Sequence, residues 1–272
     1  MSEPVLSIRN LSIDYVGAKT DFHAVKNVSF DIARGEFFGL AGESGCGKST
    51  IAFAISRLHR PPAIIRTGSQ ILLDGRDVLA LDDAALRQLR WREVAMVFQS
   101  AMNSLNPVLS IERQFYDVLH THTGMSRPDA RARATELLQL VDIPADRLSA
   151  YPHQLSGGMR QRVVIAICLA LNPKLLIMDE PTTALDVVVQ REILERIHTL
   201  RQELGFAVLF ITHDLALMAQ VSDRIGIMLE GELVEIGDAQ AIYRHPQHDY
   251  TRKLWASMPR LTGEPMRQGA PP

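Results

Sequence analysis

The chain contains only two cysteines, Cys46 and Cys168, which lie far apart in its 272 residues. Small domains that depend on disulfide bonds carry many closely spaced cysteines. The sequence therefore gives no indication of a disulfide framework, and we expect a protein that works in a reducing cytosol.

An excess of charge of one sign is also lacking, because 29 Lys and Arg residues face 31 Asp and Glu residues. A domain that binds nucleic acid usually carries a basic face and a high isoelectric point. This near balance gives no support for such a surface, so we predict no nucleic-acid partner.

Long apolar runs are absent as well. The longest stretch, Val163 to Leu171, falls well short of the ~20 residues that a membrane-spanning helix needs. Met1 to Pro4 shows no basic segment leading into an apolar one, so we expect no signal peptide. If the protein serves a membrane, we expect it to do so from outside the lipid.

Strand patterns alternate with helix patterns along most of the chain, and Phe37 to Ala41 is a short apolar strand that runs into a glycine-rich loop. Alternation of this kind favours an α/β fold with a mostly parallel sheet covered by helices. The other predicted elements are a half-buried strand at 28–32, a helix at 51–58, strands at 70–73, 94–98, 175–178 and 207–211, and a helix at 188–203.

The segment from 100 to 158 has a different character, because a helix start at Ser126 is followed by apolar residues at helical spacing. We predict that this segment is a helical lobe inserted into the α/β core. The predicted domains are a core of residues 1–99 and 159–240, the helical lobe of 100–158, and a C-terminal extension and tail of 241–272.

The glycine-rich loop satisfies the pattern GxxxxGK[ST] and lies between a strand and a helix. Its glycines allow backbone N–H groups to curl around phosphate oxygens, and the following helix N-terminus favours an anion. Lys48 would contact the β- and γ-phosphates, and the Ser49 hydroxyl would bind Mg²⁺. The predicted loop comprises Gly42, Glu43, Ser44, Gly45, Cys46, Gly47, Lys48, Ser49 and Thr50. The alternative is a glycine-rich turn with an incidental lysine.

Two carboxylates, Asp179 and Glu180, follow the apolar strand of residues 175–178. Open α/β sheets bind ligands at the C-terminal ends of their strands. Asp179 is predicted to hold the Mg²⁺ shell and Glu180 to polarise the attacking water. The alternative for two acids in this position is a turn or a helix cap.

A second anion-binding pattern occurs at Ser156, Gly157 and Gly158, which open a helix within Leu155 to Arg162. A helix N-terminus attracts an anion, but this one has neither a lysine nor metal-binding acids of its own. We therefore expect a partner chain to supply the rest of that site.

Together, the phosphate loop and the Leu155–Gln161 signature resemble those of the ATP-binding subunits of ABC transporters, over about residues 5 to 260. The resemblance implies a P-loop ATPase core with an N-terminal antiparallel β-subdomain and an inserted α-helical subdomain. It also implies a dimer in which the Ser156 helix tip of one chain closes over the ATP held by the phosphate loop of the other.

The resemblance assigns roles to further residues. Tyr15 would stack on adenine, although Phe22 and His23 lie close by in the sequence. Gln99 would touch Mg²⁺ and the attacking water and act as a hinge to the helical lobe, and His213 would contact the γ-phosphate. Asp186 would bridge the two subunits, and Gln161 belongs to the nucleotide-binding signature. The implied catalytic set is Glu180, His213, Gln99 and Lys48, and because it is intact we predict a hydrolytic ATPase.

Several segments resemble the oligopeptide and dipeptide importer branch of the family, namely 42–48, 96–107, 151–154 and 245–251. This branch implies a second ATPase subunit that is a different chain, two transmembrane permease subunits and an extracytoplasmic solute-binding protein. It places the chain on the cytoplasmic face of the cell membrane. The solute stays open among peptides, nickel, opines and oligosaccharides. No cysteine follows Cys168, so we predict no iron–sulfur centre.

Two other functions are open to such a sequence. A soluble ABC ATPase that acts on DNA or ribosomes is disfavoured by the balanced charge and by the lack of a coiled-coil insertion or a second ATPase segment. A regulatory subunit without hydrolysis is disfavoured by the intact Glu180 and His213.

Cys46 lies inside the phosphate loop and has two interpretations. It is either a small residue tolerated there or a thiol whose pKa is lowered by the helix N-terminus and Lys48. The second interpretation predicts a cysteine that reacts with alkylating reagents and is protected by ATP.

Overall fold

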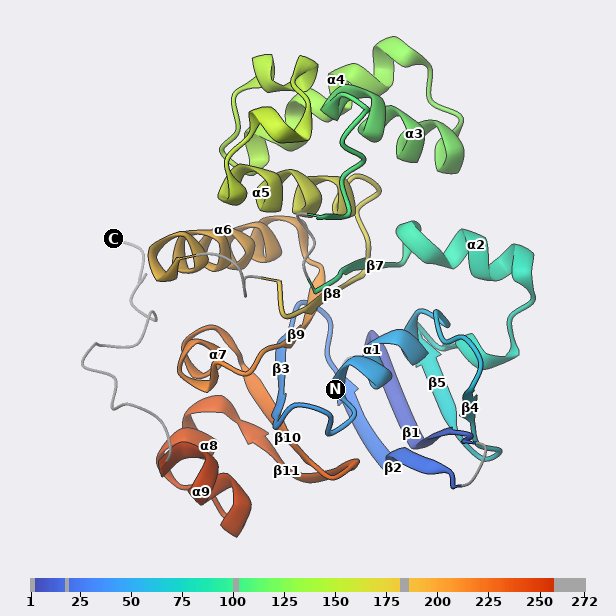
Figure 1. Ribbon diagram of the computed structural model, residues 1–272, viewed down its shortest axis with the longest axis vertical. Coiled ribbons are helices and arrows are strands. Elements are labelled where there is room, and N and C mark those ends of the chain that lie inside the picture. The colour runs from blue at the N-terminus through green and yellow to red at the C-terminus, as the bar shows by residue number, and fades with distance from the viewer. Residues whose placement is uncertain (1–2, 18–19, 100–102, 182–185, 257–272) are drawn as a thin grey trace. The chain divides into compact units, whose positions relative to one another are not determined.

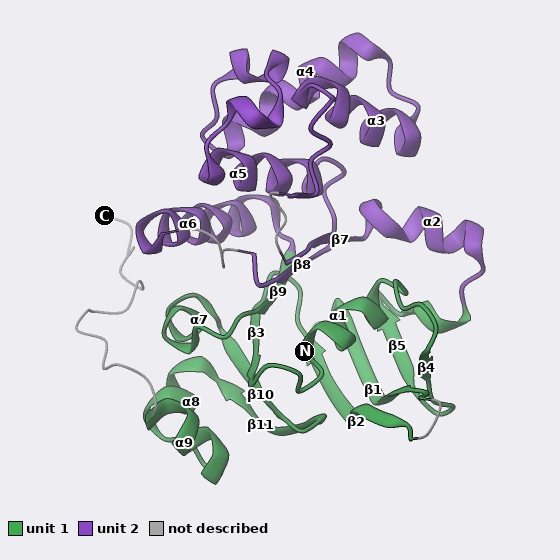
Figure 2. Ribbon diagram, in the orientation of Figure 1, with its two compact units in different colours: residues 1–80, 207–272 green, residues 81–206 purple. Residues whose placement is uncertain are grey.

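The computed structural model describes residues 3–17, 20–99, 103–181 and 186–256 (Figure 1). The chain divides into two compact units, which Figure 2 colours separately. Unit 1 contains residues 1–80 and 207–272, and unit 2 contains residues 81–206. The first three residues of the predicted helical lobe, residues 182–185, and residues 257–272 of the predicted C-terminal extension and tail lie outside the described residues.

Unit 1 contains an antiparallel sheet with the strand order β2-β1-β5-β6, and β4 also pairs with β1. In its register Leu6 of β1 lies between Ile32 of β2 and Leu73 of β5. Val28 and Phe30 are buried while the intervening Ser29 is exposed, as the predicted alternation requires. The strands are β1 (Leu6–Tyr15), β2 (Phe22–Ile32), β4 (Ala63–Ile65), β5 (Gln70–Leu73) and β6 (Arg76–Asp77).

A second set of strands in unit 1 follows the order β11-β10-β3-β9. β10, β3 and β9 are parallel, and β11 is antiparallel to β10. Every residue of β3 is buried, which explains its uninterrupted apolar sequence. These strands are β3 (Phe37–Gly42), β9 (Ala207–Ile211), β10 (Arg224–Leu229) and β11 (Glu232–Asp238).

The helices of unit 1 lie next to these strands, and α8 packs beside β10 and β11 (Figure 1). They are α1 (Lys48–Ile55), α7 (Leu215–Val221), α8 (Ala239–Arg244) and α9 (Asp249–Ala256), with the short 3-10 helix η1 (Val78–Ala80). Gly39 of β3 lies directly under α7. A Cβ atom at this residue would lie 2.6 Å from the Met218 side chain and 2.8 Å from Ser222 Oγ.

Helix α1 begins and ends three residues earlier than the sequence predicted. It begins at Lys48, directly after Gly47 of the loop. It ends at Ile55 because the N–H groups of Arg57 and Leu58 donate to the carbonyls of Ala54 and Phe53. Arg57 has a positive φ of 46°, so this is a Schellman-type helix end without glycine.

Unit 2 contains two parallel strands, β7 (Val94–Val97) and β8 (Leu175–Asp179), which pair in register from Val94↔Leu175 to Val97↔Met178. Helices α3, α4 and α5 pack against one another in one group (Figure 1). The helices are α2 (Asp83–Arg92), α3 (Ile111–Thr123), α4 (Arg127–Leu140), α5 (Gly157–Cys168) and α6 (Val187–Leu204), with 3-10 helices η3 (Ala145–Ser149) and η4 (Pro152–Gln154).

The predicted helix start at Ser126 is confirmed, because its side chain caps α4 by accepting from the Asp129 N–H. The predicted strands at 175–178 and 207–211 are also present. In the part of the chain that the structure describes, no helix combines the length and apolarity needed to cross a membrane. The domain boundaries drawn from the sequence differ from the limits of the two units and stay a prediction.

Candidate functional site

Three glycines give the loop between β3 and α1 its curvature. Gly42, Gly45 and Gly47 have φ angles of 146°, 83° and 105°, which side-chain-bearing residues rarely adopt. A Cβ atom on Gly42 would lie 2.3 Å from the Met228 carbonyl oxygen, and one on Gly47 would lie 2.4 Å from that of Ala24. The backbone therefore packs closely against β10 and β2, which requires glycine at both positions.

Lys48 is buried within this curve, with 6% of its surface exposed. Its Nζ donates to the carbonyl oxygens of Gly42 and Glu43, each at 2.8 Å, and lies 3.4 Å from Cys46 Sγ. Among the described residues, no side chain caps the N-terminus of α1. The first N–H groups of α1 therefore have no side-chain cap within the part of the chain that the structure describes. Together with the buried ammonium group of Lys48, they are suited to bind phosphate.

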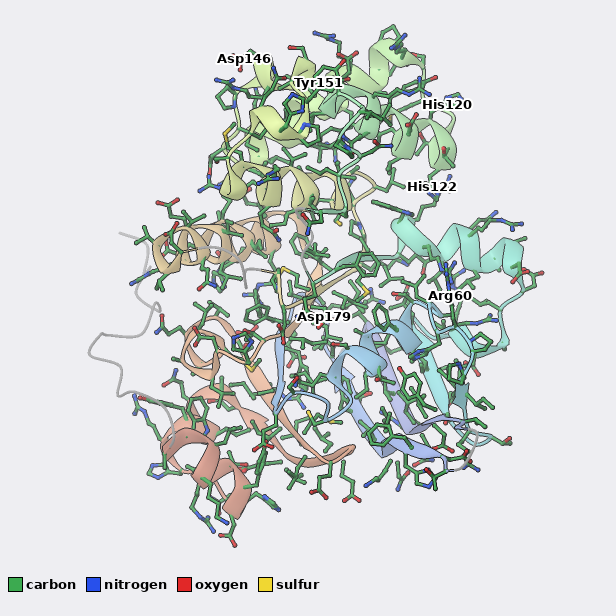
Figure 3. All side chains as sticks on the ribbon, in the orientation of Figure 1. Arg60, His120, His122, Asp146, Tyr151 and Asp179 are labelled. Carbon is green, nitrogen blue, oxygen red and sulfur yellow. The ribbon has the colours of Figure 1, made fainter. Side chains whose placement is uncertain are left out.

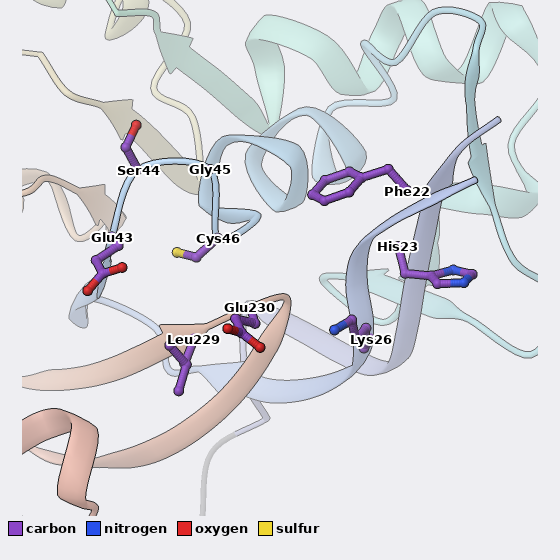
Figure 4. Close-up of a pocket in the computed structure, with 9 residues that line it drawn as sticks. All are labelled: Phe22, His23, Lys26, Glu43, Ser44, Gly45, Cys46, Leu229 and Glu230. Atoms are coloured by element: carbon purple, nitrogen blue, oxygen red, sulfur yellow. The ribbon is translucent and has the colours of Figure 1, made fainter. Parts of the chain in front are cut away.

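A pocket of about 350 Å³ adjoins the loop (Figure 4). Glu43, Ser44, Gly45 and Cys46 line one side, and β2 and the end of β10 supply Phe22, His23, Lys26, Leu229 and Glu230. The Phe22 side chain is 59% exposed, so an aromatic surface is available beside the loop.

Tyr15 does not line this pocket, but its hydroxyl lies 3.4 Å from Thr50 Oγ1 in the first turn of α1. Tyr15 pairs directly with Phe22 across β1 and β2. The structure thus places both aromatic residues near the loop, and the role of Tyr15 in stacking on adenine stays a prediction.

His213 follows β9 and is exposed, while the preceding Thr212 is buried. The next residue, Asp214, accepts a hydrogen bond at 2.9 Å from the Leu217 N–H and so caps α7. The cap fixes the start of α7, and His213 lies directly before this capping residue, between β9 and α7.

The two acidic residues that the sequence predicted for the site lie at the end of β8, in unit 2. Figure 3 labels Asp179. Asp179 is 3% exposed, and Glu180 follows it with a positive φ of 46°. Gln99 Nε2 donates to Glu180 Oε2 at 3.0 Å. Val97 and Met178 are paired across the two parallel strands. Gln99 and Glu180 each lie two positions after one of these partners, which explains their contact.

The signature segment begins with a capped helix. The Ser156 side chain accepts from the Met159 N–H at 3.2 Å, and α5 follows from Gly157. Gln161 is 1% exposed, and in the described part of the chain neither of its amide atoms has a hydrogen-bond partner. The fold thus places Gln161 inside unit 2 rather than at the helix tip, and its contact with nucleotide stays a prediction.

The start of α6 packs against the start of α5. Asp186 caps α6 by accepting from the N–H groups of Val188 at 3.1 Å and Val189 at 3.0 Å. A Cβ atom added to Gly158 would lie only 2.8 Å from Val189 Cγ1. The Asp186 carboxylate is therefore engaged within its own chain, and the bridge to a second subunit stays a prediction.

The sequence matches two known families. Residues 25–183 match the family described as ABC transporter, and residues 234–272 match the oligopeptide/dipeptide transporter C-terminal region. The chain belongs to the ABC transporter family. This finding confirms the family that the motifs indicated.

Named relatives agree with this assignment. The chain is 47% identical to "Peptidoglycan transport ATP-binding protein YejF" of Agrobacterium fabrum over 99% of its own residues, and it spans about half (49%) of that relative's length. It is 44% identical to "Oligopeptide transport ATP-binding protein OppD" of Bacillus subtilis, over 94% of this chain and 72% of that protein.

Solved structures confirm the predicted fold class. The dimeric post-hydrolysis structure of the ATP-binding cassette MJ0796 with ADP and Pi has a TM-score of 0.75 and 32% identity, covering 86% of this chain and 98% of that one. CbiO1 from Clostridium perfringens, part of the ABC transporter complex cbiONQ, has a TM-score of 0.77 and 25% identity, covering 94% and 96%.

Two groups near the loop of this ABC protein were missed by sequence reasoning. Asp14 is 3% exposed, and its hydrogen bonds from His23, at 2.7 Å, and from Arg66 hold its pKa below the ordinary value. The Tyr250 hydroxyl of α9 accepts a hydrogen bond from the Glu43 N–H at 3.2 Å. No local signal reveals either contact, although Tyr250 lies in the C-terminal segment that resembled peptide importers.

Proposed function

We propose that this ABC ATPase energises the import of peptides or a related solute. The observation that carries the proposal is the phosphate loop, in which glycines at residues 42 and 47 and the buried Lys48 form a cradle for a triphosphate. The match of residues 234–272 to the C-terminal region of oligopeptide and dipeptide transporters supports the choice of solute.

The residues of unit 1 hold the nucleotide in this proposal. Lys48 donates to the β- and γ-phosphates, while the N–H groups of the loop bind phosphate oxygens. Tyr15 or Phe22 supplies the aromatic surface for adenine. His213 contacts the γ-phosphate from the end of β9.

The predicted ligands carry oxygen groups of the kind that Mg²⁺ prefers. The Ser49 hydroxyl and the Asp179 carboxylate would hold it, the latter through water, since Mg²⁺ prefers oxygen ligands and retains water molecules. When bound, it neutralises charge on the β- and γ-phosphates. Glu180 accepts a proton from the attacking water, and Gln99 holds the Glu180 carboxylate in place for this step.

The proposed partners follow from the Ser156 helix tip, which has no lysine or metal-binding acid beside it in the sequence. A second ATPase subunit, a different chain, would bring its phosphate loop to this tip. The signature helix of that second subunit would in turn close over the phosphate loop of this chain. Two permease subunits would bind the ATPase pair at the cytoplasmic face of the membrane, and a solute-binding protein would deliver the cargo from outside.

Co-expression with candidate permease subunits, followed by co-purification, tests this proposal. We expect a complex that hydrolyses ATP with Mg²⁺ and is stimulated by the binding protein loaded with peptide. Stimulation by nickel or an oligosaccharide alone would reject peptides as the cargo. ATP turnover that responds to DNA or ribosomes, and not to membrane partners, would overturn the transport function.

A further inference from the structure

The backbone of Glu43, the second residue of the phosphate loop, is held at both its N–H and its carbonyl. Its N–H donates to the Tyr250 hydroxyl at 3.2 Å. The carbonyl oxygen of Glu43 accepts from Lys48 Nζ at 2.8 Å and from the Cys46 N–H at 3.3 Å. The Glu43 N–H shares its peptide plane with the Gly42 carbonyl, which also accepts from Lys48 Nζ at 2.8 Å. A group that fixes this N–H therefore also bears on the position of the lysine that binds phosphate.

Tyr250 is itself firmly tied to unit 1. The Glu235 carboxylate of β11 accepts from the N–H groups of Gln247 at 2.8 Å and His248 at 3.0 Å. The Tyr250 N–H then donates to His248 Nδ1 at 3.2 Å, and Arg252 donates to the Gln247 carbonyl at 2.7 Å. The turn before α9 thus holds the tyrosine from both directions along the chain.

The sheet closes this set of contacts into a ring. β11 pairs with β10, and β10 pairs with β3, which leads directly into the phosphate loop. The loop is therefore attached to β11 twice, once through the strands and once through Tyr250. Burial raises the pKa of Tyr250, so its hydroxyl stays protonated and neutral at physiological pH.

We propose that Tyr250 is a positioning residue for ATP binding, through which the C-terminal segment holds the amino-terminal limb of the phosphate loop. This proposal rests on the proposed function as an ATPase. The hydroxyl fixes the Gly42–Glu43 peptide plane, and the Gly42 carbonyl in that plane orients Lys48 together with the Glu43 carbonyl. Loss of the hydroxyl weakens the grip on the phosphates without removing any group that carries out hydrolysis.

The test compares Tyr250→Phe with Tyr243→Phe in the full-length protein within its complex. Tyr243 lies in α8, where its ring packs edge-on against Trp255 of α9 with the ring centroids 5.1 Å apart. For Tyr250→Phe we expect KM for ATP to rise about 3- to 10-fold, the effect of one neutral hydrogen bond, with kcat within about twofold. Tyr243→Phe should leave both unchanged.

Several results would overturn the proposal. They are an unchanged KM in Tyr250→Phe, a loss confined to kcat, or equal changes in both variants, which would indicate a general packing role. If the wild-type complex does not hydrolyse ATP, the proposed function fails, but Tyr250 is still tested by binding of a fluorescent ATP analogue. Hydrogen exchange of the Glu43 amide, expected to be faster in Tyr250→Phe, reports the contact without any nucleotide.

Discussion

Glu180 and Gln99 contact each other at the ends of two parallel strands. The role proposed for Glu180 concerns the hydrolysis step and not the binding of ATP. We expect Glu180→Gln to retain ATP affinity and to lower turnover by about 100- to 10,000-fold, because the amide cannot accept the proton from water. Glu192→Gln is the matched control, since Glu192 is 54% exposed and pairs with Arg162 on the surface of α6. Equilibrium ATP binding and phosphate release measure the two effects, and near-normal turnover in Glu180→Gln would contradict the assignment.

The two cysteines differ in their expected reactivity. Burial raises the pKa of Cys168 to about 12. The thiolate is the reactive form, so only roughly one Cys168 in ten thousand is reactive at pH 8, and the fraction rises as pH rises toward 12. Cys46 is 6% exposed beside Lys48 and the pocket. We expect iodoacetamide to modify Cys46 first, slowly, and more slowly still with ATP.

Mass spectrometry of the two cysteine-containing peptides measures this difference, with urea-unfolded protein as the control in which both should react. Labelling of Cys168 at the same rate as Cys46 in folded protein would contradict the burial argument. A Cys46 rate that ATP does not change would contradict its place in the nucleotide site.

Residues with local signals were predictable, whereas residues defined by distant contacts were not. The glycine spacing around Lys48 and the two acids at the end of β8 are recognisable from a few neighbouring positions. Tyr250 is 207 residues from the loop residue it contacts, and no pattern links them. Gln161 lies within a recognisable motif, but the motif does not indicate which side of the helix is buried. The burial of Gln161 was therefore not predicted.

At the scale of elements, the close approach of α5 and α6 predicts a coupling between Gly158 and Val189. We expect Gly158→Ala to lower the free energy of unfolding by about 1–3 kcal/mol, because the added methyl group overpacks against Val189. Val189→Ala removes the obstructing methyl groups, so the penalty of Gly158→Ala should shrink in that background. A double-mutant cycle by urea unfolding measures the coupling, and additive changes would contradict the contact.

Apolar runs located the buried strands, and β9 matches its predicted limits at both ends. Helix ends were less predictable, because the Schellman-type end at Arg57 uses a non-glycine residue with positive φ. Helix α2 was not predicted. Only Leu86 and Leu89 are buried in it, and Arg90 and Trp91 depart from helical angles, so its apolar pattern is short.

At the scale of the whole molecule, the signature helix predicts an assembly that depends on ATP. With Glu180→Gln to prevent turnover, we expect ATP to drive association with the partner ATPase. Adding Gly157→Glu should weaken this association at least tenfold, because the new carboxylate meets the triphosphate of the partner chain. An acid in the first turn of α5 does not oppose helix formation, so the fold should be retained.

Gln139→Glu in Glu180→Gln protein is the control, since it adds the same charge at an exposed position of α4. Sedimentation with and without ATP measures association. Equal association of the Gly157→Glu and Gln139→Glu proteins would contradict the shared site. The order of motifs predicted the family and the fold class, but one chain's sequence cannot define the geometry of a site completed by another chain.

Gly39 connects two segments of the molecule that the sequence keeps far apart. It leaves space for Met218 and Ser222, so α7 can lie against the strand that continues into the phosphate loop. A single methyl group there would push away the helix that starts just after His213. A mutation that replaces Gly39 would therefore displace α7 while every residue assigned to the nucleotide kept its identity.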